Sequence, residues 1–215
     1  MAISTALVQT MAMVLSDEIP KQGADVALFF GQTDDMSEGL FERAAELFHA
    51  GAVRYIAITG SKGERFGGTI PGECWAGGAV WRERLVARGI PDEKILTSRP
   101  SFHTRDDADG LCELAYEHQF TSGIIIAAPF HATRCMLSLI AAMHAQNYLM
   151  RVYVTTARGV DWFEPKLGPQ SLESKSTAEH LLGEIERIET YQATGDVATF
   201  EQFFSNLQSR KKTDA

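Results

Sequence analysis

Five short apolar runs alternate with segments of helical periodicity along this chain of 215 residues. The runs carry little charge and occupy residues 26–30, 55–59, 95–97, 124–128 and 151–155. Such runs are typical of parallel strands that are covered on both faces. The alternation therefore predicts an α/β fold, in which a parallel five-stranded sheet carries helices on both faces. We expect the strand order 3-2-1-4-5, numbered along the chain.

The segments between the runs place apolar residues at helical spacing. These stripes comprise Leu40, Ala44, Leu47 and Phe48; Val80, Trp81 and Leu85; Ala108, Leu111, Cys112 and Ala115; Met136, Leu139, Ile140 and Met143; and Ala178, Leu181, Leu182, Ile185 and Ile188. Gly51 and Gly89 are expected to close the first two helices. Residues 60–72 are expected to form a polar, glycine-rich loop, and Glu73 to open the helix that follows.

The two ends of the chain are predicted to be helical and to belong to one domain spanning residues 1–215. The N-terminal helix is expected within residues 1–20, where Ile3, Leu7, Met11 and Val14 recur at helical spacing. The α/β core is expected over residues 25–190. A last helix is expected at 195–208, with Phe200, Phe203, Phe204 and Leu207 on one face, and a frayed tail at 209–215.

Composition narrows the class of protein. Hydrophobic residues make up 45% and charged residues 22% of the chain, which indicates a globular protein, and the net charge of −8 argues against a general nucleic-acid binder. The 3 cysteines are widely separated, so no zinc knuckle or disulfide framework is indicated, and a cytoplasmic setting is expected. The N-terminus lacks a basic region ahead of its apolar residues, and no apolar stretch reaches the ~20 residues of a membrane span.

The end of each predicted strand is followed by residues suited to ligand binding. Because open α/β sheets bind ligands at the carboxyl edge, these residues are expected to meet there. The first and fourth strands become neighbours at the switch point, and a crevice is predicted there, ringed by Gly31, Gly60, His103 and His131. No P-loop spacing and no G-x-S-x-G motif occurs in the sequence.

His131 and Arg134 follow the fourth strand on the first turn of a predicted helix. A proton-transfer group beside a fixed cation suggests an anionic or phosphorylated ligand, and His131 is the acid–base candidate because an unperturbed histidine titrates near neutrality. The structural alternative is that His131 merely starts the helix and that Arg134 is a solvated charge. Thr104 and Asp107 favour another structural reading, a helix capping box.

The sequence does not predict a metal site. His103, Asp106, Asp107 and His131 carry suitable donor atoms, but their spacing matches no metal-binding motif. Glu73 also has a structural reading, because a carboxylate at a helix start is stabilised by the helix dipole.

An ordered set of motifs resembles the YdcF/SanA/ElyC-type family over about residues 25–155. The matching pieces are Phe30-Gly31, Arg43 with Gly51, Ile58-Thr59-Gly60, Glu73, Gly89-Ile90-Pro91, the segment 101–107 and Pro129-Phe130-His131-Ala132-Thr133-Arg134. The chain departs from the pattern at His103, where Asn is usual, at Asp106-Asp107, where Glu-Asn is usual, and at Ala127-Ala128, where Thr-Ser is usual. The resemblance implies a three-layer Rossmann-like sandwich with a pocket at the strand ends, and the chain looks like the soluble branch of the family.

Three hypotheses follow, because soluble relatives are thought to bind S-adenosylmethionine or a similar nucleotide, whereas envelope relatives are linked to polysaccharide or lipid-carrier metabolism. The first is binding of a nucleotide-like or phosphorylated small molecule, with S-adenosylmethionine as a candidate and catalysis left open. The predicted catalytic residues are His131, His103 and Asp106, and the predicted ligand-binding residues are Gly31, Gln32, Arg43, Gly60, Ser61, Lys62, Glu73, Thr104, Asp107, Phe130 and Arg134.

The second hypothesis is a hydrolase or transferase of phosphate or pyrophosphate esters, acting on a sugar or lipid carrier. Asp106 and Asp107 would matter more in that case, through a divalent metal. The third is a non-catalytic regulatory or scaffold module. It would form a homodimer through its terminal helices, with Phe203 and Phe204 on the surface.

Overall fold

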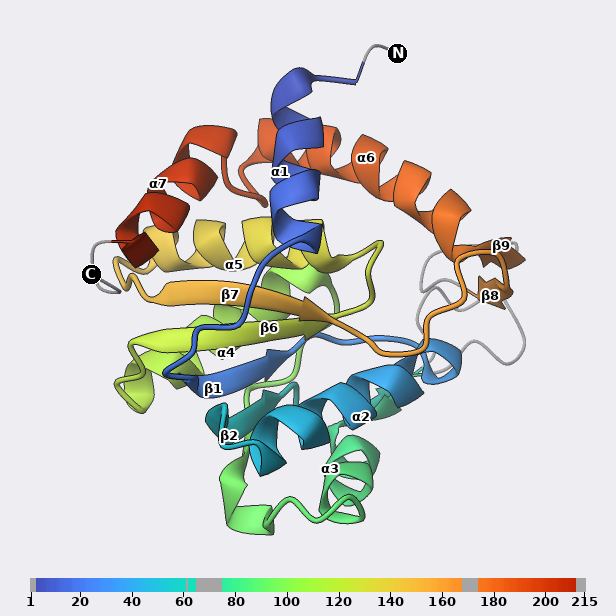
Figure 1. Cartoon of the computed structure of the whole chain (residues 1–215), viewed down its shortest axis with the longest axis vertical. Helices are drawn as coiled ribbons and strands as arrows, with labels where there is room; N and C mark the ends of the chain where they lie inside the picture. The colour runs from blue at the N-terminus through green and yellow to red at the C-terminus, as the bar shows by residue number, and fades with distance from the viewer. Residues whose placement is uncertain (1–2, 61, 65–74, 168–173, 212–215) are drawn as a thin grey trace.

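The computed structural model describes residues 3–60, 62–64, 75–167 and 174–211, and it is a three-layer Rossmann-like sandwich (Figure 1). Its central sheet consists of β1 (Ala24–Phe29), β2 (Val53–Ile58), β5 (Ile95–Thr97), β6 (Ser122–Ala127) and β7 (Arg151–Thr156). All neighbouring strands of this sheet are parallel, and their order is β5-β2-β1-β6-β7. The predicted fold class and the predicted order 3-2-1-4-5 are confirmed.

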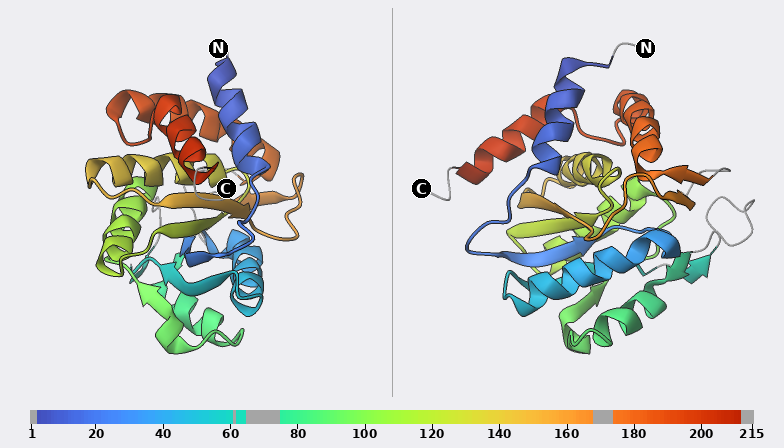
Figure 2. Two further views of the ribbon diagram at one scale, coloured as in Figure 1. Left: turned by 60° about the vertical axis from the view of Figure 1, so that its left-hand side comes forward. Right: turned by 45° about the vertical axis from the view of Figure 1, so that its right-hand side comes forward.

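One face of the sheet packs against the helices nearest the chain ends and the helices that flank β6. These are α1 (Thr5–Leu15), α4 (Thr104–Glu117), α5 (Ala132–Ala145), α6 (Thr177–Thr194) and α7 (Phe200–Lys211), and Figure 2 shows α1, α5, α6 and α7 above the sheet. Val26 and Leu28 of β1 point into this core. Helix α5 lies at its centre, in contact with α1, α4 and α7 as well as with β6 and β7. This enclosure explains why α5 buries almost every side chain rather than a single stripe.

The other face of the sheet packs against α2 (Asp34–His49) and α3 (Gly78–Val86). The alternate residues of β1, Ala27 and Phe29, point into this second core, as the two-residue period of a strand requires. Phe29 stacks on Phe41 with ring centroids 5.3 Å apart, and Trp81 meets both rings edge-on at 4.8 and 5.5 Å. These aromatic contacts stabilise the packing of α2 and α3 on the sheet.

Two small antiparallel ribbons were not predicted. Strand β3 (Lys62–Glu64) pairs with β4 (Trp75–Gly77), and β8 (Pro165–Leu167) pairs with β9 (Ser174–Ser176). The loop expected over 60–72 is therefore wrong at residues 62–64. Helix α3 begins at Gly78, and β4 precedes it, so a helix start at Glu73 is also wrong. A three-residue strand is too short to show a periodicity of its own.

The C-terminal region differs from its prediction in two places. Helix α7 continues to Lys211, and Arg210 is buried in an ion pair with Asp17, so the tail expected to fray from 209 is helical at least to 211. Phe203 is fully buried rather than on the surface. In the described part of the chain, no helix combines the length and apolarity needed to cross a membrane.

Helix α6 packs on the core through part of the expected stripe, because Ile188 is buried and Leu181 and Ile185 pack against the core, but its buried face also includes polar residues. Leu182 is 61% exposed, whereas His180 and Glu184 are buried. The buried carboxylate has two arginine partners, which explains how a polar face can point inward.

Candidate functional site

The five parallel strands end at one edge of the sheet, on the right of Figure 1, beside the N-terminal ends of α2 and α6 and the β8–β9 ribbon. Three features meet at this carboxyl edge: a carboxyl cluster around Asp107, a histidine cluster around His131, and a pocket.

The carboxyl cluster joins three strand ends. Asp107 stands in the first turn of α4, and its Oδ2 accepts a hydrogen bond from the Gly31 backbone N–H, at 3.4 Å, just after β1. Its Oδ1 accepts from the hydroxyl of Ser101, which follows β5. The Ser101 hydroxyl lies 2.7 Å from that of Thr59, at the end of β2. The predicted convergence of the loops after the first three strands is thus present.

Burial dominates the acidity of Asp107. It raises the carboxyl pKa from 3.8 to about 6, and the nearby charge of Asp106 adds to the rise. The hydrogen bonds from Ser101 and Gly31, together with the charge of His103, oppose it. A buried carboxyl that changes charge close to neutral pH is typical of functional sites, although ion-pair networks produce such shifts too.

His103, rather than Thr104, caps α4. Its Nδ1 accepts a hydrogen bond of 3.1 Å from the Asp106 backbone N–H. The predicted capping box of Thr104 and Asp107 is therefore wrong, and both of these side chains are buried. Asp106 pairs with Arg99 and accepts from the Phe102 N–H. Two of the three predicted catalytic residues, His103 and Asp106, thus hold the start of α4 in place.

The histidine cluster forms around the Thr104 hydroxyl. His131 Nε2 lies 3.2 Å from Thr104 Oγ1, and Arg134 Nη1 donates to the same oxygen. Because an arginine can only donate, the hydroxyl hydrogen of Thr104 is free to go to His131 Nε2. We therefore assign the ring proton of the neutral histidine to Nδ1.

His131 is not poised near neutrality. Burial, reinforced by the charge of Arg134, lowers its pKa from 6.5 to about 3. The buried ring is neutral at physiological pH and accepts a proton only in strong acid. The reason for expecting an acid–base role, an unperturbed pKa, is thus wrong for this environment.

Arg134 and Arg43, the cations predicted to hold an anionic ligand, both hold protein carboxylates. Arg134 pairs with Glu184, whose side chain is 1% exposed and which also pairs with Arg187 at 2.7 Å. Arg43 pairs with Glu46 at 2.7 Å and donates to Thr155 Oγ1 at 2.9 Å.

Glu184 is a site residue that the sequence reasoning missed. Its signal was present in the sequence, because His180 and Glu184 stand four residues apart on one face of the predicted helix. Nothing in the sequence indicated that Ser101, in the segment 101–107, meets Thr59, the last residue of the predicted second strand.

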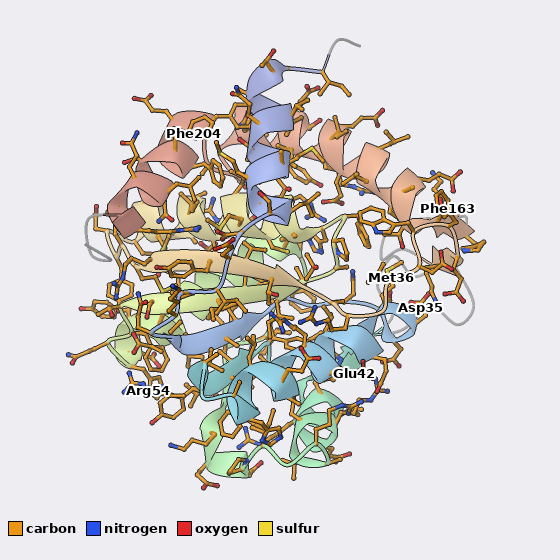
Figure 3. The ribbon with its side chains drawn as sticks, in the orientation of Figure 1. Asp35, Met36, Glu42, Arg54, Phe163 and Phe204 are labelled. Carbon is orange, nitrogen blue, oxygen red and sulfur yellow. The ribbon has the colours of Figure 1, made fainter. Side chains whose placement is uncertain are left out.

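A pocket of about 190 Å³ opens at the switch point of the sheet. Its walls come from the start of α2, the turn after β6, the loop after β7, strand β8 and the start of α6. Figure 3 labels Asp35 and Met36 at this edge, with the 82% exposed Phe163 on the neighbouring loop. The charged lining residues are Asp35, Glu38, Arg158, Asp161, Glu164 and Lys166. Acidic residues outnumber basic ones in this lining, but Glu38 is paired with Arg88 and Glu164 with Lys166. Phe130, a predicted ligand-binding residue, also lines it.

Gln32 follows β1 directly and is 3% exposed. Neither its Nε2 nor its Oε1 has a hydrogen-bond partner among the described residues. Leaving a buried polar group unpaired costs about 1–3 kcal/mol, so native proteins rarely do so without a bound water, a ligand or a functional reason. Among the predicted ligand-binding residues, Gln32 therefore gives the strongest indication of a bound partner.

The remaining predicted residues contribute less. A Cβ atom at Gly60 would lie 2.2 Å from the Ser98 carbonyl oxygen, so this glycine allows a close approach of protein backbone. Ser61 and Glu73 lie outside the described residues, and Lys62 is described only through its backbone in β3.

No group of three or more His, Cys, Asp or Glu side chains in the described part of the chain is arranged to hold a metal ion. The described residues therefore give no support to the metal that the second hypothesis uses.

No protein-family model matches this chain, and no curated protein sequence matches it, so its resemblance to the YdcF/SanA/ElyC-type family stays a prediction.

Proposed function

We propose that this protein binds a nucleotide-like small molecule at the carboxyl edge of its sheet, with S-adenosylmethionine as the leading candidate. One observation carries the proposal: both polar atoms of the buried Gln32 amide, Nε2 and Oε1, lack a hydrogen-bond partner among the described residues. Gln32 belongs to the segment that joins β1 to the start of α2, which lines the pocket. An amide offers one donor and one acceptor side by side, as a nucleobase edge requires. A ligand that pairs with this amide removes the cost of its burial.

The charge of the pocket favours one member of this ligand class. Two of its carboxylates are already paired, Glu38 with Arg88 and Glu164 with Lys166, and Asp161 adds a carboxylate that accepts from the Phe163 and Glu164 backbone N–H groups. Nucleotides and sugar phosphates bring negative charge into such a lining, whereas S-adenosylmethionine is a net cation, with a sulfonium and an ammonium group against one carboxylate. The anionic ligand suggested by Arg134 is less well supported, because Glu184 already neutralises that cation.

The size of the pocket bears on how the ligand lies. Its 190 Å³ is smaller than the roughly 300–1,000 Å³ of sites that enclose a drug-sized ligand. We infer that the pocket receives the charged part of the ligand, and that the remainder extends along the sheet edge towards Gln32.

Thermal unfolding of the full chain against a ligand panel tests the proposal. S-adenosylmethionine should raise the melting temperature, because a ligand at a hundredfold excess over Kd stabilises the native state by about 2.7 kcal/mol. S-adenosylhomocysteine, which lacks the sulfonium charge, should give a smaller rise, and ATP should give none. A panel in which ATP alone raises the melting temperature would contradict the charge argument.

Two matched variants locate the site. Gln32→Met keeps the side-chain volume and removes the unpaired amide, so the variant should fold with undiminished stability and lose the ligand-induced rise. Thr10→Val removes another buried polar atom without a described partner, in α1, and should keep the rise. Equal rises in both variants would show that the ligand binds elsewhere.

A second candidate function is hydrolysis or transfer of a phosphate ester, favoured by the pKa of about 6 at Asp107. Turnover of p-nitrophenyl phosphate, with Mg²⁺, Mn²⁺ or Zn²⁺ added, should then fall in Asp107→Asn. Asp109→Asn, which changes a half-buried carboxylate of the same helix that pairs with Arg105, is the control. Failure of all three metals to support any turnover would remove this candidate.

A further inference from the structure

Asp107 connects the segment that carries Gln32 with two other strand ends. Its carboxylate holds the Gly31 N–H, and Gly31 immediately precedes Gln32. Its other oxygen holds Ser101, which in turn meets Thr59. The carboxyl group thus anchors the β1–α2 segment, although Asp107 does not line the pocket itself.

The direction of this hydrogen-bond chain depends on one proton. When Asp107 is ionised, it accepts from Gly31 and Ser101, and the Ser101 oxygen accepts from Thr59. When the carboxyl is protonated on Oδ1, it must donate to Ser101, which then turns to donate to Thr59. The charge that strengthens the bond from Gly31 N–H also disappears. Proton uptake therefore reverses the chain and loosens the anchor of the β1–α2 segment.

We propose that ligand binding at the carboxyl edge is coupled to this proton, so that the site takes its ligand with Asp107 ionised and releases it when Asp107 is protonated. The inference rests on the proposed function and names a regulation of the same site. Asp107 acts here as a positioning residue, through Gly31 and Gln32. By reciprocity, binding of the ligand expels the proton.

The surroundings of Asp107 support this assignment. Burial raises its pKa to about 6, so its charge changes within the range that cells and their compartments visit. The charged groups that act on it from its own helix are Asp106 and His103. From α5, the Cys135 thiol is buried with a pKa raised far above neutrality, and His131 has a pKa of about 3, so neither changes charge between pH 5 and 7. The segments after β1, β2 and β5 contribute Gly31, Thr59 and Ser101, which carry no charge.

Calorimetric titration of the full chain with S-adenosylmethionine, between pH 5 and 8, tests the coupling. We expect a constant Kd above pH 7 and a rise approaching about tenfold per pH unit below pH 6, the limit for one linked proton. Titrations near pH 6 in two buffers of different ionisation enthalpy should show net proton release on binding.

Three variants separate Asp107 from its neighbours. Asp107→Asn imitates the protonated carboxyl, since its amide donates to Ser101, and should bind weakly at every pH without proton release. Ser101→Ala removes a bond that stabilises the carboxylate, so it should keep binding and move the midpoint to higher pH. His103→Asn retains a good N-cap and removes only the smallest of the influences on the Asp107 pKa, so it should keep the pH dependence with at most a small shift of its midpoint to higher pH.

The outcomes distinguish the coupling from the function beneath it. Binding whose affinity is flat from pH 5 to 8, or whose pH dependence survives in Asp107→Asn, overturns the coupling and leaves the proposed function standing. If Asp107→Asn fails to fold, an unshifted midpoint in Ser101→Ala overturns the coupling instead. Absence of binding at every pH overturns the proposed function and the coupling with it.

Discussion

The pKa values of two buried residues at the carboxyl edge shift in opposite directions for the same reason. Burial disfavours the charged form of each, so the pKa of Asp107 rises to about 6 and that of His131 falls to about 3. Their effects on stability oppose each other in mild acid. The contribution of Asp107 is full below its unfolded pKa of 3.8 and is lost as the pH rises through 6. That of His131 is full above 6.5 and is lost as the pH falls towards 3.

Asp107→Asn should stabilise the protein at pH 8 and not at pH 4. The variant cannot ionise, so it avoids the cost of a buried charge, which is of order 1–3 kcal/mol for a shift of about two pKa units. Urea unfolding at the two pH values measures the difference. An equal effect at both would show that the change acts through packing and not through charge.

The His131 ring should remain neutral at pH 5 and carry its proton on Nδ1. The Thr104 hydroxyl donates to Nε2, and Arg134 opposes a second positive charge. Nitrogen-15 chemical shifts of the imidazole report both the charge and the tautomer. A ring already cationic at pH 5.5 would contradict the assignment.

At the scale of single elements, a buried ion pair between Arg134 of α5 and Glu184 of α6 joins the two helices. Removing one partner of such a pair leaves the other charge buried without compensation, which typically costs about 3–5 kcal/mol of stability. Glu184→Gln should therefore lower the free energy of unfolding by an amount of that order. Glu186→Gln, on the exposed face of the same helix, should change it by less than about 0.5 kcal/mol. Similar effects in the two variants would show that the pair contributes little.

Helix α2 approaches the loop after β7 so closely that only glycine fits at position 39. A Cβ atom there would lie 2.3 Å from the Arg158 carbonyl oxygen, and Arg158 N–H donates to the Gly39 carbonyl. Gly39→Ala should destabilise the fold by about 1–3 kcal/mol, because backbone must move. Gly183→Ala, inside α6 with only the Arg187 side chain nearby, should stabilise it by up to about 1 kcal/mol. Melting temperatures shifted in the same direction would contradict the predicted clash.

Elements that contain a long run or stripe of apolar residues could be predicted from the sequence, whereas elements that depend on distant partners could not. Strands β1 and β6 are buried on both faces, so each leaves an uninterrupted apolar run. Strands β3 and β8 span three residues each and exist only through pairing with β4 and β9. The burial of Glu184 in α6 was not predicted, because its partner Arg134 lies 50 residues away in the sequence.

At the scale of the whole molecule, parallel topology accounts for the part of the site that could be predicted. Loops after β1 and β6 must meet because these strands are neighbours, and Gly31 and His131 do meet residues of one helix, α4. The burial of Asp107 rather than Asp106 also had a signal, since Asp107 shares the helical face of Leu111. The pairing of Arg134 with a protein carboxylate had no such signal in the sequence, because it depends on where α6 packs.

The central claim, that the carboxyl edge at the switch point holds the ligand, is tested most directly by mapping backbone amide chemical shifts during titration with S-adenosylmethionine. Chemical-shift changes should concentrate at Gly31, Gln32, Met36 and Phe130, whereas Thr10 in α1 and Phe204 in α7 should stay unchanged. Shifts confined to α1 and α7, or absent throughout at saturating ligand, would contradict the central claim.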